Sequence, residues 1–324
     1  MKTVFIVNPK AGQGKNTELL INKINETANI LELPCKVYVT KGVGDAGRFV
    51  EDYCTNFGPA RFIACGGDGT LNEVLNGVIE FEDAEVGVIP IGTGNDFCRN
   101  FGGAEVFSHI EGQFLGQSEP CDAIRYTTYI DGAEKSGYCA NMFNIGFDCN
   151  VADMTQTMKT KPLISGPMAY FVSILVNLIK KNGANLKIEL DGQEKHTGPL
   201  LLTAIANGCY CGGGIKSNPL ASVQDGLISV NIIKDVPRYK FVRLLPHYMK
   251  GTFLKLKNIE KIILSTKCKK IKLTPAFANM RLCIDGEITD AGQTEFEIVH
   301  NAFNFVLPLK KEEQVKAEKE AVLN

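Results

Sequence analysis

The chain has 324 residues, 44% of them hydrophobic and 22% charged, which is typical of a globular protein large enough for two domains. Its formal net charge of −1 excludes a general electrostatic attraction to nucleic acid. The 11 cysteines, an odd number, indicate a reducing cytoplasm rather than a disulfide framework. The N-terminal residues lack signal-peptide features, and no apolar stretch reaches the roughly 18 residues that cross a bilayer. We therefore expect a cytoplasmic protein, with any membrane contact peripheral.

Strands and helices are predicted to alternate through the first 120 or so residues. The predicted strands are Thr3–Val7, Cys35–Thr40, Arg61–Cys65 and Val86–Pro90, with helices after the first three, at residues 19–24, 46–53 and 71–79. This alternation favours a parallel, doubly wound α/β sheet. Ligands bind such sheets at the carboxyl ends of the strands.

The first strand runs into a glycine-containing turn at residues 8–15. It is not a Walker A loop, because Pro9 stands where the first glycine belongs and Asn16 follows Gly14-Lys15. From its residues alone this turn is equally consistent with phosphate binding and with a simple change of chain direction.

The stretch from Phe62 to Glu73 has the most informative pattern in the chain. A buried strand is followed by Gly66-Gly67-Asp68-Gly69-Thr70, where glycines permit a sharp turn and close approach of a ligand. Thr70 and Glu73 have capping-box spacing, so free N–H groups at a helix start would form a phosphate site. A carboxylate inside such a site requires a cation, which predicts a nucleotide–Mg²⁺ site. A βα turn without ligand is the alternative.

A third turn, Ile91–Phe97, repeats the theme with two glycines, a threonine, an asparagine and Asp96. All three turns directly follow strands, so all three can lie on one rim of the sheet. Two of them carry an aspartate, which strengthens the prediction of a metal–nucleotide site there.

From about Asp122 the pattern becomes rich in strands. The predicted strands include residues 123–129, 137–145, 186–190, 200–207, 227–233, 259–265, 271–274, 281–284 and 295–300. One helix is predicted at Gly166–Lys181. Many strands broken by turns favour an all-β sandwich or curled sheet.

Several turns in this second part leave alternatives open. Asn207–Gly214 is either a bulge between sheets or a functional loop, and Ser222–Leu227 either an ordinary Asp-Gly turn or an ion site. Asp285 and Glu287 lie at a tight turn, and the local pattern there favours a solvated hairpin over paired acid–base chemistry. Eight lysines between Lys250 and Lys272 favour a solvated strand face, with a surface for anionic lipid as the alternative.

Together these motifs resemble the soluble diacylglycerol kinase catalytic family, which includes bacterial lipid kinases and the sphingosine and ceramide kinases. The resemblance rests on Asn8–Gly12, Gly66–Glu73, Ile89–Phe97, Asn144–Asp148, Gly212–Gly214, Pro219–Ala221, Asp225-Gly226 and Asp285–Glu287. The Gly-Gly-Asp-Gly-Thr turn is shared with NAD kinases and relatives of phosphofructokinase. The motif from Gly92 to Phe97 and the later Asp-Gly-Glu are more specific.

The resemblance implies an ATP- and Mg²⁺-dependent kinase that phosphorylates a lipid hydroxyl, with diacylglycerol converted to phosphatidic acid as the leading case. It implies an N-terminal α/β nucleotide-binding domain like that of NAD kinase, residues 1–122, to which about 303–324 return. Residues 123–302 would form an all-β sandwich for the lipid substrate.

The resemblance also implies roles for individual residues. ATP would be held by Asn8, Thr40, Gly66, Gly67, Asp68, Gly69, Thr70, Asn72 and Thr93. Asp68, Asp96 and Glu287 would order water and Mg²⁺ around the phosphates, and Asp285 would be the general base. A separate structural Mg²⁺ would take the Asp225 side chain and the carbonyls of Ser222 and Leu227.

Three alternatives stay open from the sequence: a kinase for another lipid such as a sphingoid base, a kinase for a soluble nucleotide such as NAD, and a non-catalytic lipid-binding relative. The acceptor lipid and the oligomeric state, a homodimer included, are not determined by these motifs.

Overall fold

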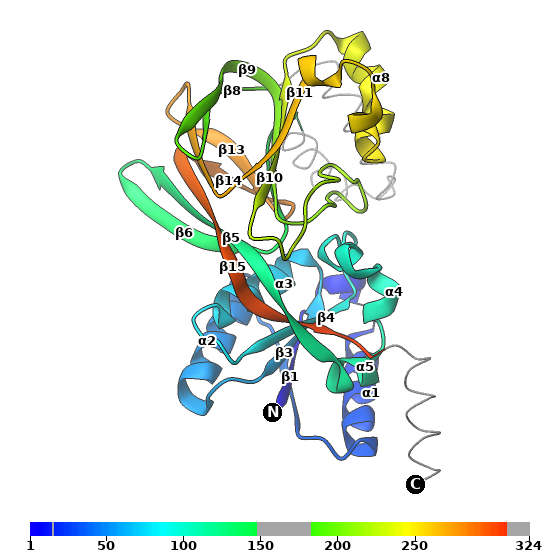
Figure 1. The fold of residues 1–324 in the computed structure, drawn as a ribbon. Coiled ribbons are helices and arrows are strands. Elements are labelled where there is room, and N and C mark those ends of the chain that lie inside the picture. Colours follow the sequence, from blue (N-terminus) through cyan, green and yellow to red (C-terminus); the bar gives the residue numbers. More distant parts are fainter. Residues whose placement is uncertain (15, 148–182, 310–324) are drawn as a thin grey trace. The chain divides into compact units, whose positions relative to one another are not determined.

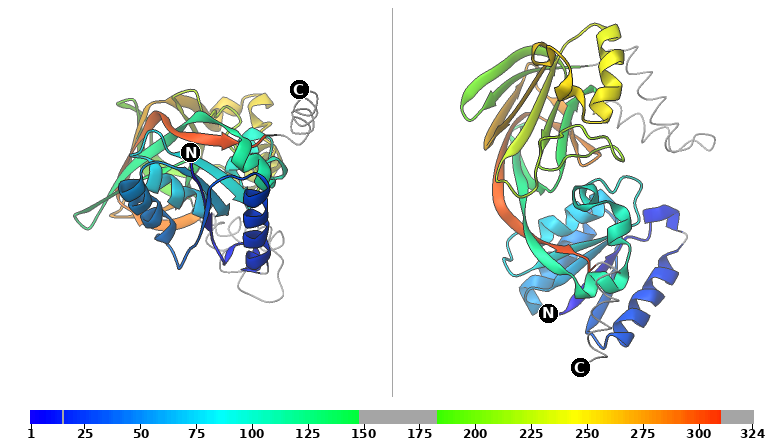
Figure 2. Two further views of the ribbon diagram at one scale, coloured as in Figure 1. Left: turned by 90° about the horizontal axis from the view of Figure 1, so that it is seen from below. Right: turned by 45° about the vertical axis from the view of Figure 1, so that its right-hand side comes forward.

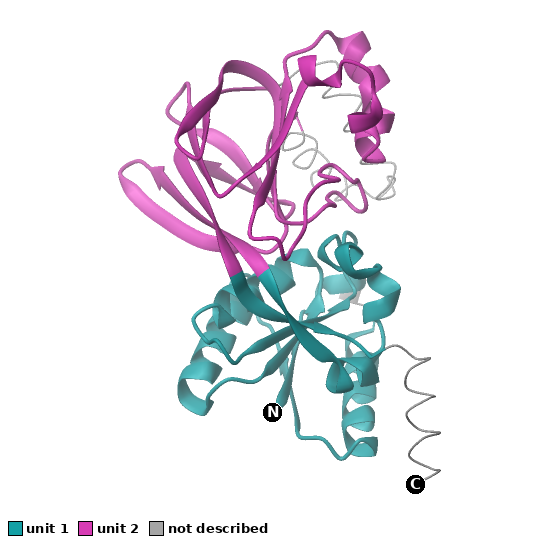
Figure 3. Cartoon of the chain, viewed as in Figure 1, with its two compact units in different colours: residues 1–121, 301–324 teal, residues 122–300 magenta. Residues whose placement is uncertain are grey.

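The structure is a computed structural model that describes residues 1–14, 16–147 and 183–309 (Figures 1 and 2). The chain divides into two compact units (Figure 3). Unit 1 comprises Met1–Cys121 and the chain from Asn301 on, and unit 2 comprises Asp122–His300. Within the described residues no helix is both long and apolar enough to span a membrane.

Unit 1 is built on a parallel sheet with the strand order β2-β1-β3-β4. Its main elements are β1 (Thr3–Val7), α1 (Thr17–Ile30), β2 (Cys35–Val39), α2 (Asp45–Phe57), β3 (Arg61–Gly66), α3 (Asp68–Val78) and β4 (Glu85–Pro90). Short helices complete the unit: η1 (Ala11–Gly14), η2 (Phe97–Phe101), α4 (Ala104–Phe107) and α5 (Ile110–Leu115). The end of the last strand, β15 (Gln293–Leu307), adds parallel to β4.

The inner strands β1, β3 and β4 are buried on both faces, which explains their continuous apolar runs, whereas the edge strand β2 is only partly buried. Phe5 packs on one face with Ile24 of α1 and Phe114 of α5. Phe62 packs on the other face, where its ring meets Tyr53 of α2 edge-on. Helices on both faces make the sheet doubly wound, as the alternating sequence pattern predicts.

The returning end of β15 is fixed in unit 1 by phenylalanines. Phe305 is fully buried, and its ring lies edge-on to Phe97 with the centroids 4.9 Å apart. Phe101 and Phe107 also pack on Phe305. Aromatic burial of this size anchors the strand beside β4, although more than 200 residues separate the two in sequence.

Unit 2 is an antiparallel β structure. Its strands are the greater part of β5 (Gln117–Ile130), β6 (Ala133–Cys139), β7 (Met142–Gly146), β8 (Ala184–Leu190), β9 (Gln193–Ala206), β10 (Ile228–Lys234), β11 (Ile263–Cys268), β12 (Lys270–Pro275), β13 (Met280–Ile284), β14 (Glu287–Ala291) and the first part of β15. The order β14-β13-β7-β9-β8-β12-β15 forms the main path, and β10 joins β9 to β11. One helix, α8 (Arg238–Met249), and two short turns, η3 (Phe253–Lys255) and η4 (Ile259–Lys261), complete the described part.

Most predicted strands of unit 2 are confirmed, with three corrections. The strand expected at 137–145 is interrupted, because β6 ends at Cys139 and β7 begins at Met142. The strand expected at 259–265 is wrong for its first residues, because Ile259–Lys261 form a 3-10 turn and β11 begins at Ile263. Helix α8 was not predicted at all. The helix predicted at Gly166–Lys181 lies outside the described residues.

Candidate active site

The three glycine turns of unit 1 lie side by side at the carboxyl ends of β1, β3 and β4, as predicted. Parallel pairing aligns Val7 with Cys65 and Gly66 with Pro90, so the turns begin at the same level of the sheet. The Asn8 N–H donates to the Cys65 carbonyl at 3.0 Å, and the Ile91 N–H donates to the Gly66 carbonyl at 2.9 Å. Backbone hydrogen bonds thus join the three turns into one rim.

Two of these turns touch through their backbones. A Cβ atom on Gly92 would overlap the Cα of Gly67, and one on Gly66 would overlap the Thr70 side chain. Real Cβ atoms do not tolerate such distances, so Gly92 is required for the two turns to pack together and Gly66 for its own turn to fold closely onto Thr70. The sequence pattern indicates glycines for a sharp turn and for close approach of a ligand, and the structure adds this packing requirement.

Helix α3 starts inside the rim at Asp68, with Gly67 as its N-cap. By helix geometry its first N–H groups have no intrahelical acceptor, and they carry the positive end of the helix dipole. This end of α3 is therefore suited to an anion such as a phosphate group.

The capping-box prediction for α3 is wrong. Because the N-cap is Gly67, Thr70 and Glu73 lie too far along the helix to form such a box. The Thr70 hydroxyl instead accepts a hydrogen bond from Asn8 Nδ2 at 3.1 Å. The Glu73 carboxylate accepts the N–H groups of Gly44 at 2.8 Å and Ala46 at 3.2 Å, at the start of α2.

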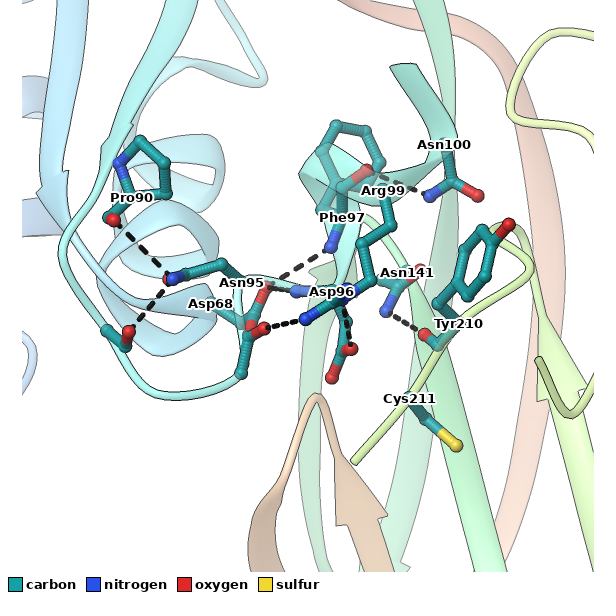
Figure 4. A network of polar contacts seen from close by, with 12 residues as sticks. Asp68, Pro90, Asn95, Asp96, Phe97, Arg99, Asn100, Asn141, Tyr210 and Cys211 are labelled. Atoms are coloured by element: carbon teal, nitrogen blue, oxygen red, sulfur yellow. Dashed lines mark hydrogen bonds and ion pairs between the residues drawn. The ribbon is translucent and has the colours of Figure 1, made fainter. Parts of the chain in front are cut away.

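Two aspartates lie next to each other on this rim (Figure 4). Oδ1 of Asp68 accepts the N–H groups of Asp96 at 2.8 Å and Phe97 at 3.3 Å, which fixes the third turn against α3. Burial, followed by the negative charge of Asp96, raises the pKa of Asp68 to about 6. Asp96 is buried, and its Oδ1 lies 3.3 Å from Nε of Arg99.

Asn95 holds the shape of the third turn, a role that sequence reasoning missed. Its backbone has φ of 52°, in the left-handed region that asparagine tolerates better than most residues. Its side-chain Nδ2 donates to the carbonyls of Gly92 at 2.8 Å and Pro90 at 3.4 Å (Figure 4). An asparagine following glycine in a turn was the only sequence signal for this role.

The other proposed nucleotide-binding residues of unit 1 also lie on or beside the rim. Thr40 directly follows β2 and is buried, and its N–H donates to the Val7 carbonyl at 2.9 Å. Thr93 is exposed at the tip of the third turn. Asn72 has a buried side-chain oxygen for which the described residues provide no hydrogen-bond donor. Such an atom calls for a donor from a ligand or water.

Asp285 lies in the two-residue turn of the β13–β14 hairpin in unit 2. Ile284 pairs with Glu287, and Asp285 and Gly286 both have positive φ, of 46° and 91°. Positive φ at both central residues is the signature of a type I′ turn, for which Asp-Gly is a preferred pair. The expected hairpin is confirmed.

The Asp285 carboxylate is held by two donors from the corner between β6 and β7. Oδ1 accepts the Met142 N–H at 2.9 Å, and the Cys139 thiol donates to Oδ2 at 3.2 Å. Burial, together with the Asp285 charge, raises the pKa of Cys139 well above its usual value, so Cys139 stays a protonated donor. This carboxylate is therefore fixed in orientation rather than free in solvent, while Glu287 on the same hairpin is exposed.

The Asp225 turn, where a structural Mg²⁺ is predicted, is paired with a lysine side chain. Oδ2 of Asp225 forms an ion pair with Nζ of Lys267, and Oδ1 accepts the Leu227 N–H at 3.1 Å. Because an ammonium group already balances the only carboxylate of this turn, the residues present fit a structural Mg²⁺ poorly. The metal role of Ser222, Asp225 and Leu227 stays a prediction.

A buried aspartate fixes the same turn, another contact that sequence reasoning missed. Asp122 is fully buried, and its Oδ2 accepts the Gly226 N–H at 2.7 Å. Its Oδ1 lies 2.7 Å from Nδ1 of His300. No local pattern links residues 122, 226 and 300, so only the fold reveals this contact.

The aspartate pair on the rim has the chemistry of a magnesium site. Asp68 and Asp96 supply hard oxygen donors, and their proximity leaves negative charge that a cation would offset. The described residues contain no cluster of three or more histidine, cysteine or carboxylate side chains suited to a metal. The two carboxylates fit the donor set of Mg²⁺, which nucleotide sites usually bind through one or two carboxylates.

Comparison with known proteins matches most of the chain to two families. The family described as "Diacylglycerol kinase catalytic domain" matches residues 2–126, and the family described as "YegS C-terminal NAD kinase beta sandwich-like domain" matches residues 141–307. The lipid kinase YegS of Escherichia coli K12 is 32% identical over 228 residues, which cover 68% of this chain and 71% of that protein.

The chain belongs to the diacylglycerol kinase and YegS lipid kinase family. A diacylglycerol kinase of Bacillus subtilis is 27% identical over 257 residues, which cover 78% of this chain and 79% of the relative. A crystal structure of a diacylglycerol kinase from Bacillus anthracis shares the fold, with a TM-score of 0.68 at 22% identity, over 94% of this chain and 96% of that one.

Membership of this lipid kinase family confirms the resemblance and the fold class predicted from the motifs. The chain is an enzyme of the kinase class with an alcohol group as the phosphoryl acceptor. The β-sandwich of the family corresponds to the antiparallel strands of unit 2.

Proposed function

We propose that this enzyme transfers the γ-phosphoryl group of ATP to the hydroxyl of diacylglycerol, forming phosphatidic acid, in a Mg²⁺-dependent reaction. The observation that carries the proposal is the start of α3 beside the paired carboxylates of Asp68 and Asp96, on a rim made of three joined glycine turns. Helix N–H groups attract phosphate, and the carboxylates attract the cation that accompanies it.

In this proposal the rim of unit 1 binds the nucleotide. The N–H groups of Gly69 and Thr70 at the start of α3 would donate to phosphate oxygens, and the Gly66-Gly67 backbone leaves room for close approach. Asn72 would donate or accept a hydrogen bond through its buried amide, whose oxygen lacks a donor within the described chain. Asn8, Thr40 and Thr93 would complete the nucleotide contacts from neighbouring strand ends.

Mg²⁺ fits beside Asp68 and Asp96 and, when bound, would neutralise charge on the transferred phosphate. Asp68 keeps the third turn in place through its bonds to the N–H groups of residues 96 and 97. Glu287 would order water near the reacting groups. These roles stay proposals that mutation can test.

Asp285 would accept the proton of the lipid hydroxyl as that oxygen attacks the phosphorus atom. The Met142 N–H and the Cys139 thiol hold the two carboxylate oxygens, so that the base is oriented before the substrate arrives. Phosphoryl transfer requires little covalent work from a protein beyond positioning and charge stabilisation. A fixed base and an anion-binding helix start supply both.

The test is phosphoryl transfer from radiolabelled ATP to a panel of acceptors, consisting of diacylglycerol, a sphingoid base and NAD. We expect labelled phosphatidic acid, formed only when Mg²⁺ is present and abolished by EDTA. Transfer to the sphingoid base alone would keep the reaction class and change the substrate. Transfer only to NAD, or to none of the acceptors, would refute the proposed function.

We propose further that the enzyme works in the cytoplasm as a peripheral protein, since its acceptor resides in a bilayer. Diacylglycerol has no charged headgroup and stays in the membrane, so the protein must reach the membrane surface.

A further inference from the structure

Helix α8 of unit 2 has apolar residues on two opposite faces. Its inner face carries Phe241, Leu244 and Tyr248, which are buried in one cluster with side chains of β9, β10 and β11. Its outer face bears Tyr239, Val242 and Met249, whose exposed fractions are 70%, 50% and 36%. The spacing of three, then seven residues places these three side chains in one stripe along the helix. A single exposed apolar side chain needs no explanation, but a stripe of them on one helix does.

Basic side chains lie beside this stripe. Residues 234–261 contain eight lysines and arginines and only two acids, Asp235 and Glu260, in a chain whose overall net charge is −1. Lys240, Arg243 and Lys250 are exposed on α8 or directly after it. Within the described part of the chain, no carboxylate pairs with any of these three. The surface around α8 is therefore strongly positive.

The structure divides the lysine-rich stretch that sequence analysis left open. Lys267, Lys270 and Lys272 belong to β11 and β12 and form ion pairs with the side chains of Asp225, Glu297 and Glu295. These lysines have a structural role in unit 2. The lysines before residue 262 are exposed, and they lie at the end of α8 or in the chain that follows it. Among the described residues, the exposed lysines of this stretch before residue 262 and Lys269 form no such ion pair, so they are suited to an external anionic partner.

We propose that the outer face of α8, with the basic residues beside it, docks the enzyme on an anionic lipid bilayer. Tyrosine side chains favour the bilayer interface, while valine and methionine favour the apolar region beneath the headgroups. Lysine and arginine beside them pair with negative headgroups and lay their alkyl stems along apolar surface. The combination matches an interfacial helix that lies on the membrane rather than a helix that spans it. This inference rests on the proposed function only in that the acceptor lipid explains why a membrane surface is needed.

The test is co-sedimentation of the full chain with vesicles of phosphatidylcholine, with or without phosphatidylglycerol. We expect wild-type protein to bind only the vesicles that contain phosphatidylglycerol. The double variant Lys240→Gln/Arg243→Gln should bind them about 30-fold more weakly, because each basic residue near an anionic surface contributes roughly a fivefold gain. The matched control Lys23→Gln/Lys135→Gln removes the same charge from exposed positions elsewhere and should bind like wild type.

A second variant, Tyr239→Ser/Val242→Ser, tests the apolar stripe. It should weaken vesicle binding by roughly tenfold through loss of buried apolar area, and the loss should persist at high salt, where the charge contribution is screened. Unchanged binding by both patch variants would overturn the proposal. A second result would also overturn it: patch variants that lose self-association in analytical ultracentrifugation but still bind vesicles. The outer face of α8 would then contact a second copy of the chain rather than a membrane.

Activity on a dispersed, short-chain diacylglycerol separates this proposal from the proposed function. The patch variants should phosphorylate the dispersed substrate at the wild-type rate and lose activity only on vesicle-borne diacylglycerol. If wild type binds the anionic vesicles through α8 but phosphorylates no diacylglycerol in either form, the docking surface stands and the proposed substrate fails. Equal activity of wild type and variants on vesicles would count against docking through α8.

Discussion

Replacing Asp68 by asparagine should stabilise the nucleotide-free protein while it removes activity. The pKa of Asp68 is raised from 3.8 to about 6, first by burial and then by the charge of Asp96. Because the pKa of Asp68 is higher in the folded than in the unfolded protein, its contribution to the free energy of unfolding is most favourable below pH 3.8. This contribution is lost as the pH rises through 6. At pH 8 a shift of roughly two units corresponds to at most about 3 kcal/mol of destabilisation by the ionised group.

Asparagine has no charge to bury, and its amide oxygen can still accept the N–H groups of residues 96 and 97. We expect Asp68→Asn to unfold at a higher urea concentration than wild type at pH 8, by up to about 3 kcal/mol, with the difference vanishing near pH 4. Urea titrations at both pH values, with EDTA present, measure this. A variant less stable than wild type at pH 8 would refute the reasoning, because the charge would then be a net benefit to the fold. A stabilising change that abolishes phosphoryl transfer would indicate that the charge is kept for function.

Three further changes probe the framework of the site. Glu73→Gln should lower the free energy of unfolding by about 1 kcal/mol, because a neutral side chain binds the N–H groups at the start of α2 more weakly, and an unchanged urea midpoint would contradict this. Gly92→Ala should lower the free energy of unfolding by about 1–3 kcal/mol, because the added Cβ overlaps the facing turn. Gly42→Ala, whose Cβ has open space around it, is the control in the same urea titration. Lys267→Met should lower the free energy of unfolding by roughly 0.5–1 kcal/mol in EDTA, since the Asp225 carboxylate loses its ammonium partner. Addition of Mg²⁺ should then raise the melting temperature of this variant. A melting temperature that responds equally to Mg²⁺ in wild type and variant would show that Lys267 does not take the place of a metal.

The rim of unit 1 was predictable because its signals are local. The glycine turn at residues 66–69 and the turn at 92–97 each follow an apolar strand directly, so their position on a parallel sheet follows from topology alone. The same holds for the hairpin at Asp285-Gly286, whose residue types match its turn geometry.

Contacts between distant parts of the chain could not be predicted. Glu73 has the spacing of a helix cap, but a tertiary contact with residues 44 and 46 uses its carboxylate instead. The donors that orient Asp285 come from Cys139 and Met142, more than 140 residues away, and no periodicity connects them.

Helix α8 escaped prediction for a related reason. Apolar residues lie on its exposed face as well as on its buried face, which blurs the single-faced pattern that marks a helix. Pro246 inside the helix further obscures it, since proline is disfavoured in helix interiors. Local rules therefore failed at the element that we propose as the docking surface, as expected where function departs from folding requirements.

The most direct test of the account is phosphoryl transfer from labelled ATP to diacylglycerol in mixed micelles, with wild type compared with Asp285→Asn. Asparagine keeps the Met142 N–H contact but cannot take up the hydroxyl proton, so turnover should fall by roughly 10²–10⁴-fold with little change in melting temperature. Phosphatidic acid formed by wild type and nearly lost in the folded variant would establish both the reaction and its base. Near-wild-type turnover by Asp285→Asn would contradict the assignment of Asp285, and absence of phosphatidic acid with wild type would contradict the proposed reaction.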